Sequence, residues 1–317
     1  MSSENIKLPK IDFCDEDLKP GTLVWNQVKS QVHKALVEYG CFEASFDKIP
    51  IHLRKSIFEF SQEMLDLPLQ TKLKNVSPLT KPFHGYVGQN PRIPLYESMG
   101  INDPNIPHKA EKFTQILWPQ GNPTFCKIIQ SYSKQLSQLD QTVRKMLLES
   151  LGVEKYMDEH MNSTYYNLRP IKYKAPQSSE AEVGLYTHTD KSIFSILHQN
   201  QVNGLQILTK DGQWINVEPT PETFIVMIGD SLYAWANGQV HVPYHRVMMK
   251  GNEARYSIAL FSIPKAGYII KAPHELVDEE HPLLFKPFDY HEYQAFYYTE
   301  EGQRCEHPLK AYCGVSV

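Results

Sequence analysis

The sequence predicts a mainly β protein with helices, in which a helical part over residues 1–155 precedes a β-rich part over residues 156–317. Apolar residues recur at helical spacing as far as Ser150. From Tyr165 onward, short β-rich runs alternate with turn residues, which is typical of a sandwich or barrel. Because no repeat or flexible linker separates the two parts, we expect them to pack as one compact unit.

Three amphipathic helices and one short strand are expected in the helical part. Thr22 and Gly152 are residue types that begin and end helices, and Pro50 is tolerated in a first helical turn. The helices are expected over residues 22–40, 50–68 and 124–150, and the strand over residues 41–46.

The segment from Pro82 to Pro119 has no clear periodicity and is rich in proline, glycine, asparagine and aromatic residues. Long loops of this kind are often binding segments or lids, although others are merely ordered coil. We expect this loop to supply contacts to a bound molecule.

The β-rich part carries its own turn residues, such as the Lys210-Asp211-Gly212 tripeptide. Its tail from Phe285 to Tyr298 is rich in aromatic residues and is expected to form a final helix on the barrel. The clearest strands are expected over residues 204–208, 214–217, 224–228 and 255–263.

The composition argues against several functional classes. The 317 residues include 32 Lys and Arg against 36 Asp and Glu, so no basic excess indicates nucleic-acid binding. Apolar runs such as Phe224 to Ile228 are far shorter than the ~20 residues of a membrane span. The N-terminus lacks the apolar region of a secretory signal, and the five cysteines form no CxxC pair. We expect a cytoplasmic, monomeric protein that acts on a small molecule, with no nucleic-acid or membrane partner.

A pair of metal-ligand residue types lies on one predicted strand. His188 and Asp190 are two residues apart, so their side chains share a face of that strand. The segment His241 to Val247 offers His241 or His245 as a third ligand. Two histidines and one carboxylate leave about three positions of a metal open, as in non-haem Fe(II) oxygenases. Alone, the His188/Asp190 pair is a weak signal that fits an unrelated surface pair better, because such a tripeptide occurs often by chance.

A second pair, Arg255 and Ser257, shares a face of the strand that follows His245. A guanidinium beside a hydroxyl suits a carboxylate that is held in a fixed orientation. In isolation, an ordinary surface salt bridge is the alternative for Arg255. The same face continues through Ala259, Phe261 and Ile263, which would line an apolar interior.

Taken together, these motifs resemble the plant-type Fe(II)/2-oxoglutarate-dependent dioxygenases over residues 8 to 300. The order of the motifs and the 55 residues from Asp190 to His245 fit that family. The sequence around His188 and His245 is most similar to the branch of glucosinolate side-chain-modifying and auxin-oxidising dioxygenases. The matching segments are His188-Thr189-Asp190, His245-Arg246-Val247, Arg255-Tyr256-Ser257, Gly204-Leu205-Gln206, Gly229-Asp230, Asn237-Gly238 and Leu168-Arg169-Pro170-Ile171-Lys172-Tyr173.

The resemblance implies a double-stranded β-helix, or jelly-roll, core at about residues 160–265, with a helical N-terminal region and a C-terminal helix. It also implies Fe(II), 2-oxoglutarate as co-substrate, O2 and stimulation by ascorbate. The family commonly has Asn where this chain has Ile171, two residues before Tyr173, which removes a possible polar contact to 2-oxoglutarate. The implied residues are His188, Asp190 and His245 for the metal; Arg255, Ser257 and Tyr173 for 2-oxoglutarate; and Tyr86, Phe194, Phe261 and Ile263 for the substrate pocket.

The implied reaction is oxidation, most simply hydroxylation, of a small and largely apolar plant hormone or specialised metabolite, with release of succinate and CO2. Two alternatives stay open. One is an oxidase on the same scaffold that does not use 2-oxoglutarate. The other is a non-catalytic binding barrel with structural zinc held by His188, Asp190, His241 and His245. His241 and His198 are otherwise expected to be bystanders beside the two histidine ligands.

Overall fold

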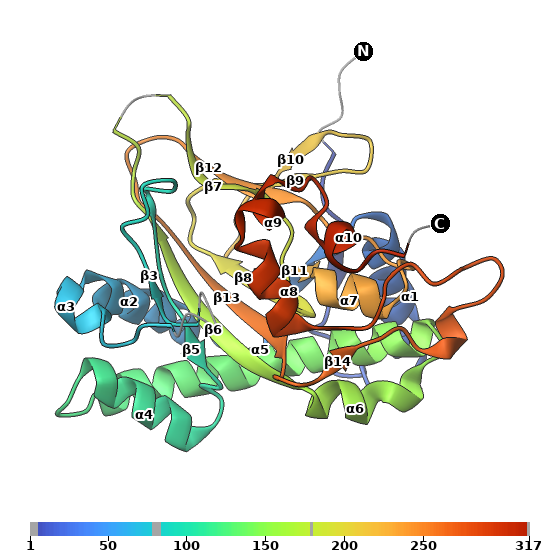
Figure 1. The fold of residues 1–317 in the computed structure, drawn as a ribbon. Coiled ribbons are helices and arrows are strands. Elements are labelled where there is room, and N and C mark those ends of the chain that lie inside the picture. The colour runs from blue at the N-terminus through green and yellow to red at the C-terminus, as the bar shows by residue number, and fades with distance from the viewer. Residues whose placement is uncertain (1–5, 78–83, 178–179, 316–317) are drawn as a thin grey trace, which may run out of the picture.

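The computed structural model describes residues 6–77, 84–177 and 180–315 of the chain. A large sheet and a small sheet face each other, and helices cover the outer face of the large sheet (Figure 1). The sandwich predicted for the β-rich part is therefore present. Its large sheet extends into the helical part of the sequence.

The large sheet draws its strands from both parts of the chain, because the strand predicted at residues 41–46 pairs with a strand near residue 225. All neighbours in this sheet are antiparallel except the first pair. The order is β1 (Lys10–Asp12), β2 (Cys41–Ser45), β11 (Thr223–Ile228), β8 (Phe194–Gln199), β13 (Arg255–Pro264), β6 (Thr164–Tyr173), β4 (Tyr96–Met99) and β3 (Tyr86–Val87), with β5 (Ile101–Asn102) also on β6.

The small sheet is fully antiparallel and packs its inner face on the large sheet. Val247 and Met249 of this sheet share a buried apolar cluster with Ile171 and Leu197 of the large one. A further short pair, β14 (Ile269–Ile270) and β15 (Phe288–Asp289), lies outside both sheets. The order in the small sheet is β10 (Trp214–Asn216), β9 (Leu205–Leu208), β12 (His245–Met249) and β7 (Glu182–His188).

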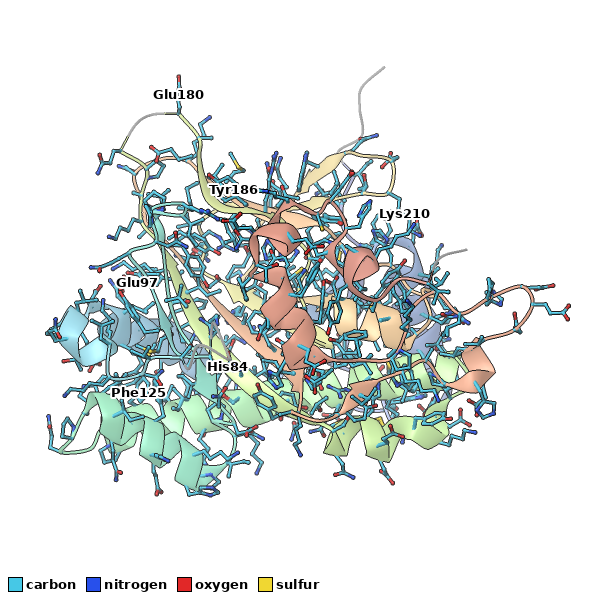
Figure 2. The ribbon with its side chains drawn as sticks, viewed as in Figure 1. His84, Glu97, Phe125, Glu180, Tyr186 and Lys210 are labelled. Carbon is cyan, nitrogen blue, oxygen red and sulfur yellow. The ribbon has the colours of Figure 1, made fainter. Side chains whose placement is uncertain are left out.

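Helices form the layer behind the large sheet, and the three predicted helices are all present. Thr22 caps the first of them by accepting a hydrogen bond from the Trp25 backbone N–H. The long helix α5 buries an apolar stripe that includes Phe125, Leu136 and Val143 against the sheet and its neighbouring helices (Figure 2). The helices of this layer are α1 (Leu23–Glu38), α2 (Ile51–Asp66), α3 (Leu69–Lys72), α4 (Pro107–Leu117), α5 (Pro123–Ser150) and α6 (Met157–Asn162).

Two regions differ from the prediction. The segment expected to be one long loop contains strands β3, β4 and β5 and the helix α4, whose Phe113 packs on Phe125. Its first residues, Pro82 and Phe83, lie outside the described residues. The helix predicted for the tail is present but shorter: α8 (Tyr290–Tyr297) follows β15, and two further short helices, α9 (Glu300–Arg304) and α10 (Pro308–Cys313), come after it in front of the sheets (Figure 1). The short helix α7 (Asp230–Trp235) follows β11.

A buried ion pair fixes the long helix to the strand beside it. The fully buried guanidinium of Arg144 donates to Asp140 Oδ2 at 2.8 Å and to the carbonyl of His160 at 3.1 Å. The hydroxyl of Tyr166, on β6, donates to the same Asp140 oxygen at 3.0 Å. Since β6 also ends at Tyr173, this network sets the position of a strand that carries a predicted site residue.

Replacing Arg144 by methionine is expected to lower the free energy of unfolding by about 3 to 5 kcal/mol, because Asp140 would keep a buried charge without its partner. Urea unfolding followed by circular dichroism measures the change. Arg304→Met is the control, since its ion pair with Glu300 is exposed and little change is expected. Equal unfolding midpoints for Arg144→Met and the parent protein would contradict the structural role.

Candidate active site

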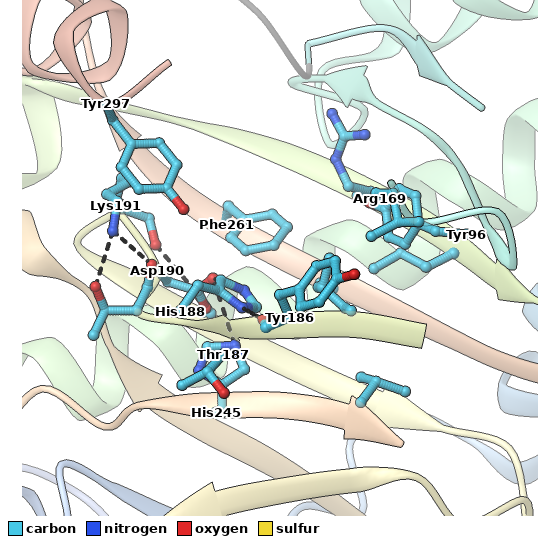
Figure 3. Close-up of a pocket in the computed structure, with 18 of the residues that line it drawn as sticks. Tyr96, Arg169, Tyr186, Thr187, His188, Asp190, Lys191, His245, Phe261 and Tyr297 are labelled. Carbon is cyan, nitrogen blue, oxygen red and sulfur yellow. Dashed lines mark hydrogen bonds and ion pairs between the residues drawn. The ribbon is translucent and has the colours of Figure 1, made fainter. Parts of the chain in front are cut away.

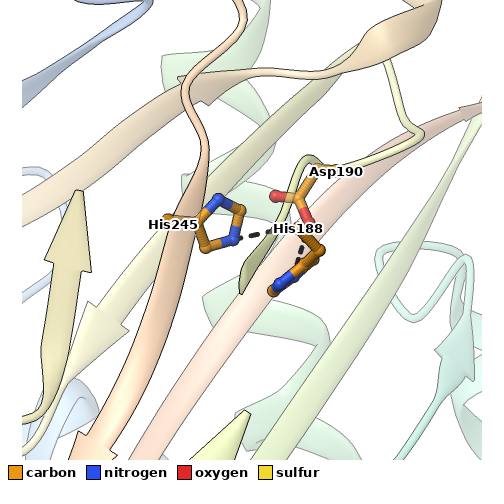
Figure 4. A group of neighbouring side chains, drawn as sticks. All are labelled: His188, Asp190 and His245. Atoms are coloured by element: carbon orange, nitrogen blue, oxygen red, sulfur yellow. Dashed lines mark ion pairs between the residues drawn. The ribbon is translucent and has the colours of Figure 1, made fainter. Parts of the chain in front are cut away.

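Antiparallel pairing of β7 with β12 places two histidines directly opposite each other. His188 is the last residue of β7 and His245 the first of β12, and the two are register partners with ring centroids 4.2 Å apart. Asp190 follows β7 and turns its carboxylate between the rings (Figure 4). The Nε2 atoms of His188 and His245 each lie 3.8 Å from Asp190 Oδ1. The structure thus brings together the three predicted metal ligands.

The hydrogen bonds of the two imidazoles orient their free nitrogens toward one point. His188 Nδ1 lies 2.8 Å from the carbonyl of Tyr186, and His245 Nδ1 lies 3.3 Å from that of Pro243. A carbonyl accepts only from a protonated nitrogen, so the proton of a neutral ring lies on Nδ1 and the lone pair on Nε2, which faces Asp190. Burial, and then the neighbouring His245, lower the pKa of His188, which favours the neutral ring.

This donor set fits a divalent cation of intermediate softness. One ligand atom from each of the three side chains lies within 4.8 Å of the others. Two neutral imidazoles and a carboxylate on one side of an ion leave further positions open, the arrangement of non-haem Fe(II) oxygenases. His241 is not one of the described residues whose ligand atoms could share one ion. A closed zinc site with four protein ligands therefore has no support. His241 lies before β12, with its backbone N–H bonded to Leu36.

A buried guanidinium lies deeper in the same cavity. Arg255 is fully buried, donates from Nη2 to Gln199 Oε1 at 2.5 Å and from Nη1 to Ser257 Oγ at 3.4 Å, and lies 5.1 Å from the ring centre of Tyr173. None of the described carboxylates forms an ion pair with Arg255. Burying such a charge without an anion is costly, so this site favours a carboxylate ligand.

A second buried arginine shows how different this environment is. The guanidinium of Arg54 is saturated by the backbone carbonyls of Ile49, Phe46 and Pro221, at 2.7 to 2.8 Å. Arg255 instead has two neutral side-chain partners, and its Nε atom is buried without a hydrogen bond. The contacts of Arg54 are therefore those of a structural residue, whereas the guanidinium of Arg255 still has a nitrogen without an acceptor.

One cavity of about 620 Å³ contains both groups. Alternate residues of β13 form one wall, from Arg255 at one end of the strand to Ile263 near the other. The facing residues of β6 include Arg169 and Asn167, and exposed Tyr186 lies at the rim (Figures 2 and 3). A ligand bound at Arg255 and one bound beyond the His188/Asp190/His245 cluster would therefore share one space.

Two of the predicted substrate-pocket residues line the cavity and two do not. Phe261 and Ile263 belong to its wall. Phe194 is wrong as a pocket residue because it lies on the opposite face of β8, where it packs with the helical layer, whereas Ser195 and Leu197 face the cavity.

Tyr86 also lies outside the cavity lining. Its hydroxyl donates to Glu97 at 2.8 Å, and the Lys72 ammonium lies 5.4 Å from its ring centre (Figure 2). The segment predicted to supply contacts does so through other residues, namely His84, Asn90, Arg92, Ile93 and Tyr96.

The predicted bystander His198 lies on β8 and points to the helical layer. Although it is an even number of residues from His188, it belongs to another strand, and its Nδ1 lies 3.0 Å from the hydroxyl of Tyr132 on α5. Burial lowers its pKa to about 3, so the ring is neutral in this apolar setting.

The sequence analysis missed several residues of the site. Gln199, the neutral partner of Arg255, belongs to none of the predicted site motifs. Ile171 is the register partner of Ser257, so the departure from the family pattern places an apolar group beside the hydroxyl. The C-terminal helices also contribute lining residues, which no local motif reveals; they are Tyr290, Gln294, Tyr297, Tyr298, Gln303 and Cys305.

The fold and the site together define a non-haem metal oxygenase with two histidines and one carboxylate. Two family models match the chain: residues 8–120 match the model "non-haem dioxygenase in morphine synthesis N-terminal", and residues 157–264 match the 2OG-Fe(II) oxygenase superfamily. The probable 2-oxoglutarate-dependent dioxygenase AOP1 of Arabidopsis thaliana is 50% identical over 317 residues, covering 98% of this chain and 97% of that protein. The chain belongs to the 2OG-Fe(II) oxygenase superfamily.

Solved structures agree with this assignment. The dioxygenase for auxin oxidation from rice is 28% identical and has a TM-score of 0.81, with 97% of this chain and 100% of that chain covered. JOX2, solved in complex with 2OG, Fe and JA, is 26% identical and has a TM-score of 0.80, with 96% and 89% covered. The jelly-roll core with helices is confirmed, and the protein is a dioxygenase that uses Fe(II) and 2-oxoglutarate. No described helix has the length and apolar character needed to cross a bilayer.

His188→Ala and Asp190→Ala are each expected to abolish tight binding of Co(II), a probe for Fe(II), because each removes one of three protein ligand atoms. Isothermal titration calorimetry under nitrogen measures the binding. His241→Ala is the matched control and is expected to bind like the parent, since His241 lies outside the cluster. Loss of binding in His241→Ala with retention in His188→Ala would show that the third ligand is misassigned.

Proposed function

We propose that this dioxygenase hydroxylates a small, largely apolar plant hormone or specialised metabolite, with release of succinate and CO2. The observation that carries the proposal is the shared cavity: a buried guanidinium without a carboxylate partner, the His188/Asp190/His245 cluster and apolar side chains all line one space. Each part matches one requirement of the reaction, namely a site for 2-oxoglutarate, a site for iron and a site for the compound that is oxidised.

In this proposal, the C5 carboxylate of 2-oxoglutarate binds to Arg255 and Ser257. The Nη atoms of Arg255 already point at the Ser257 hydroxyl and at Gln199, so the fork is oriented before the ligand arrives. Tyr173 lies beside the guanidinium and restricts its position from the other side. The other end of 2-oxoglutarate then extends toward the metal cluster, because both line one cavity.

His188, Asp190 and His245 would hold the iron through two Nε2 atoms and a carboxylate oxygen. The chemistry that iron supplies there is oxidation of the substrate coupled to decarboxylation of 2-oxoglutarate. The carbonyls of Tyr186 and Pro243 keep both imidazoles in the tautomer that can bind a metal. The apolar wall around Phe261 excludes water from the reacting carbon.

The lining of the cavity supports a small substrate with apolar surface. Side chains there include Ile93, Tyr96, Leu185, Phe261 and Ile263. The volume of about 620 Å³ accommodates 2-oxoglutarate together with one small organic molecule. Two similar structures are consistent with this class, since the rice protein is described by auxin oxidation and JOX2 was solved with JA beside 2OG and Fe.

The purified protein with Fe(II), 2-oxoglutarate and ascorbate is expected to consume 2-oxoglutarate faster when a pool of plant hormones and specialised metabolites is added. Mass spectrometry is expected to find one compound of the pool gaining 16 mass units, with about one succinate formed per product. A mass gain without succinate release would instead indicate an oxidase that does not use 2-oxoglutarate. Substrate binding without any oxidation would support a binding barrel.

Arg255→Gln is expected to raise the KM for 2-oxoglutarate about 100-fold, since loss of one partner of a buried charge pair costs about 2 to 5 kcal/mol. Steady-state succinate release at increasing 2-oxoglutarate measures the change. Arg54→Gln is the matched control, because Arg54 is also buried without a carboxylate but contacts only backbone carbonyls. An unchanged KM in Arg255→Gln would remove this residue from the 2-oxoglutarate site.

A further inference from the structure

A buried lysine lies immediately after the metal-cluster carboxylate. Lys191 follows Asp190, and only 9% of its surface is exposed. Its ammonium donates to the carbonyl and hydroxyl oxygens of Thr189, at 2.8 and 2.9 Å, and pairs with Asp230 Oδ2 at 2.9 Å. All three N–H groups of the ammonium therefore have an acceptor. The charge is fixed in position and also lines the cavity.

The start of α7 holds the backbone of the same two residues. The N–H of Asp230 donates to the carbonyl of Asp190 at 2.7 Å, and the hydroxyl of Ser231 donates to the carbonyl of Lys191 at 2.6 Å. Asp230 thus binds the segment twice, through its backbone at Asp190 and through its carboxylate at Lys191. This segment determines where the Asp190 carboxylate lies between His188 and His245.

The C-terminal helix α8 closes the network from the other side. The hydroxyl of Tyr293, fully buried, donates to Asp230 Oδ2 at 2.6 Å. The ring centre of Tyr297 lies 4.4 Å from the Lys191 ammonium, a cation–π contact (Figure 3). Helix α8 also contributes Tyr290 and Gln294 to the cavity lining. The Lys191–Asp230 pair therefore joins the metal-cluster segment, α7 and the helix that covers the cavity.

We propose that Lys191 is a positioning residue that couples the seating of α8 over the cavity to the position of the Asp190 carboxylate. A buried ion pair adds little net stability compared with an apolar pair of similar size, but it enforces one geometry. Groups that orient metal ligands from behind change metal affinity by about 10- to 100-fold when they are removed. The inference rests on the proposed role of His188, Asp190 and His245 in holding iron.

Two variants test the coupling. Lys191→Met removes the charge and keeps the apolar stem, and Tyr293→Phe removes only the hydroxyl that binds Asp230. The matched controls are Lys172→Met, which loses an ion pair with Asp66, and Tyr268→Phe, which loses a hydroxyl contact to Glu159. Both controls lie outside the cavity lining.

The first measurement is Co(II) binding under nitrogen with saturating 2-oxoglutarate. Calorimetry gives the affinity, and the visible absorption of the bound ion reports its coordination. The second is the rate of trypsin cleavage after exposed Arg304, in the segment that follows α8, with and without Co(II) and 2-oxoglutarate. We expect Lys191→Met to weaken Co(II) binding about tenfold and to alter the absorption band. Co(II) with 2-oxoglutarate is expected to slow cleavage in the parent and controls, and to lose this effect in both test variants.

Parent-like Co(II) affinity and absorption in both test variants would overturn the inference and leave Lys191 with a structural role only. Equal protection of Arg304 in the parent and the test variants would overturn it as well. If Lys191→Met fails to fold, Tyr293→Phe decides, since it retains the ion pair. A His188→Ala variant that binds Co(II) like the parent would instead disprove the metal site itself, whatever Lys191 does.

Discussion

The antiparallel pairing of β7 with β12 is the contact on which the site depends. It places His188 and His245 opposite each other across two strands, although 57 residues separate them in the sequence. Only the pair's register brings the two Nε2 atoms to one side of Asp190, and a shift by one residue would turn one ring to the other face of the sheet. The carbonyls two residues before each histidine then hold the rings, so one local geometry serves both.

The second constraint is the alternation of side chains along β13. Arg255, Ser257, Ala259, Phe261 and Ile263 face the cavity, whereas Ile258 and Leu260 pack on the helices. One strand therefore provides a charged end, a hydroxyl and an apolar wall in a fixed order. Because β6 pairs with this strand along its whole length, Tyr173 is held next to Arg255. The network of Arg144 and Asp140 in turn anchors β6 to α5, which links a structural ion pair to the site.

The sequence was sufficient for features that depend on short-range spacing. Helical periodicity located the helices at Leu23–Glu38, Ile51–Asp66 and Pro123–Ser150. His188 and Asp190 do lie together as predicted, although β7 ends at His188 and Asp190 follows the strand instead of sharing its face. Prediction from the sequence failed where a residue's position depends on which face of a strand packs against which layer. Phe194 is an aromatic residue of the kind that lines pockets, but the alternation of side chains along β8 turns it toward the helices. Lys191 and Tyr293 meet only after the chain has folded back across α7, so no local pattern identifies them.

The buried charged residues of this protein differ in the kind of partner that each one has. Each nitrogen of the Arg54 guanidinium donates to a backbone carbonyl, and Arg144 donates to a carboxylate, a carbonyl and a hydroxyl. The Lys191 ammonium has three acceptors in two segments: Thr189, next to the Asp190 carboxylate, and Asp230 on α7. Arg255 has only neutral side-chain partners and a buried Nε without a hydrogen bond. Burying a charge without an anion is costly, and Arg255 lines the cavity that also holds the His188/Asp190/His245 cluster, which supports the proposal that a carboxylate of the co-substrate binds there.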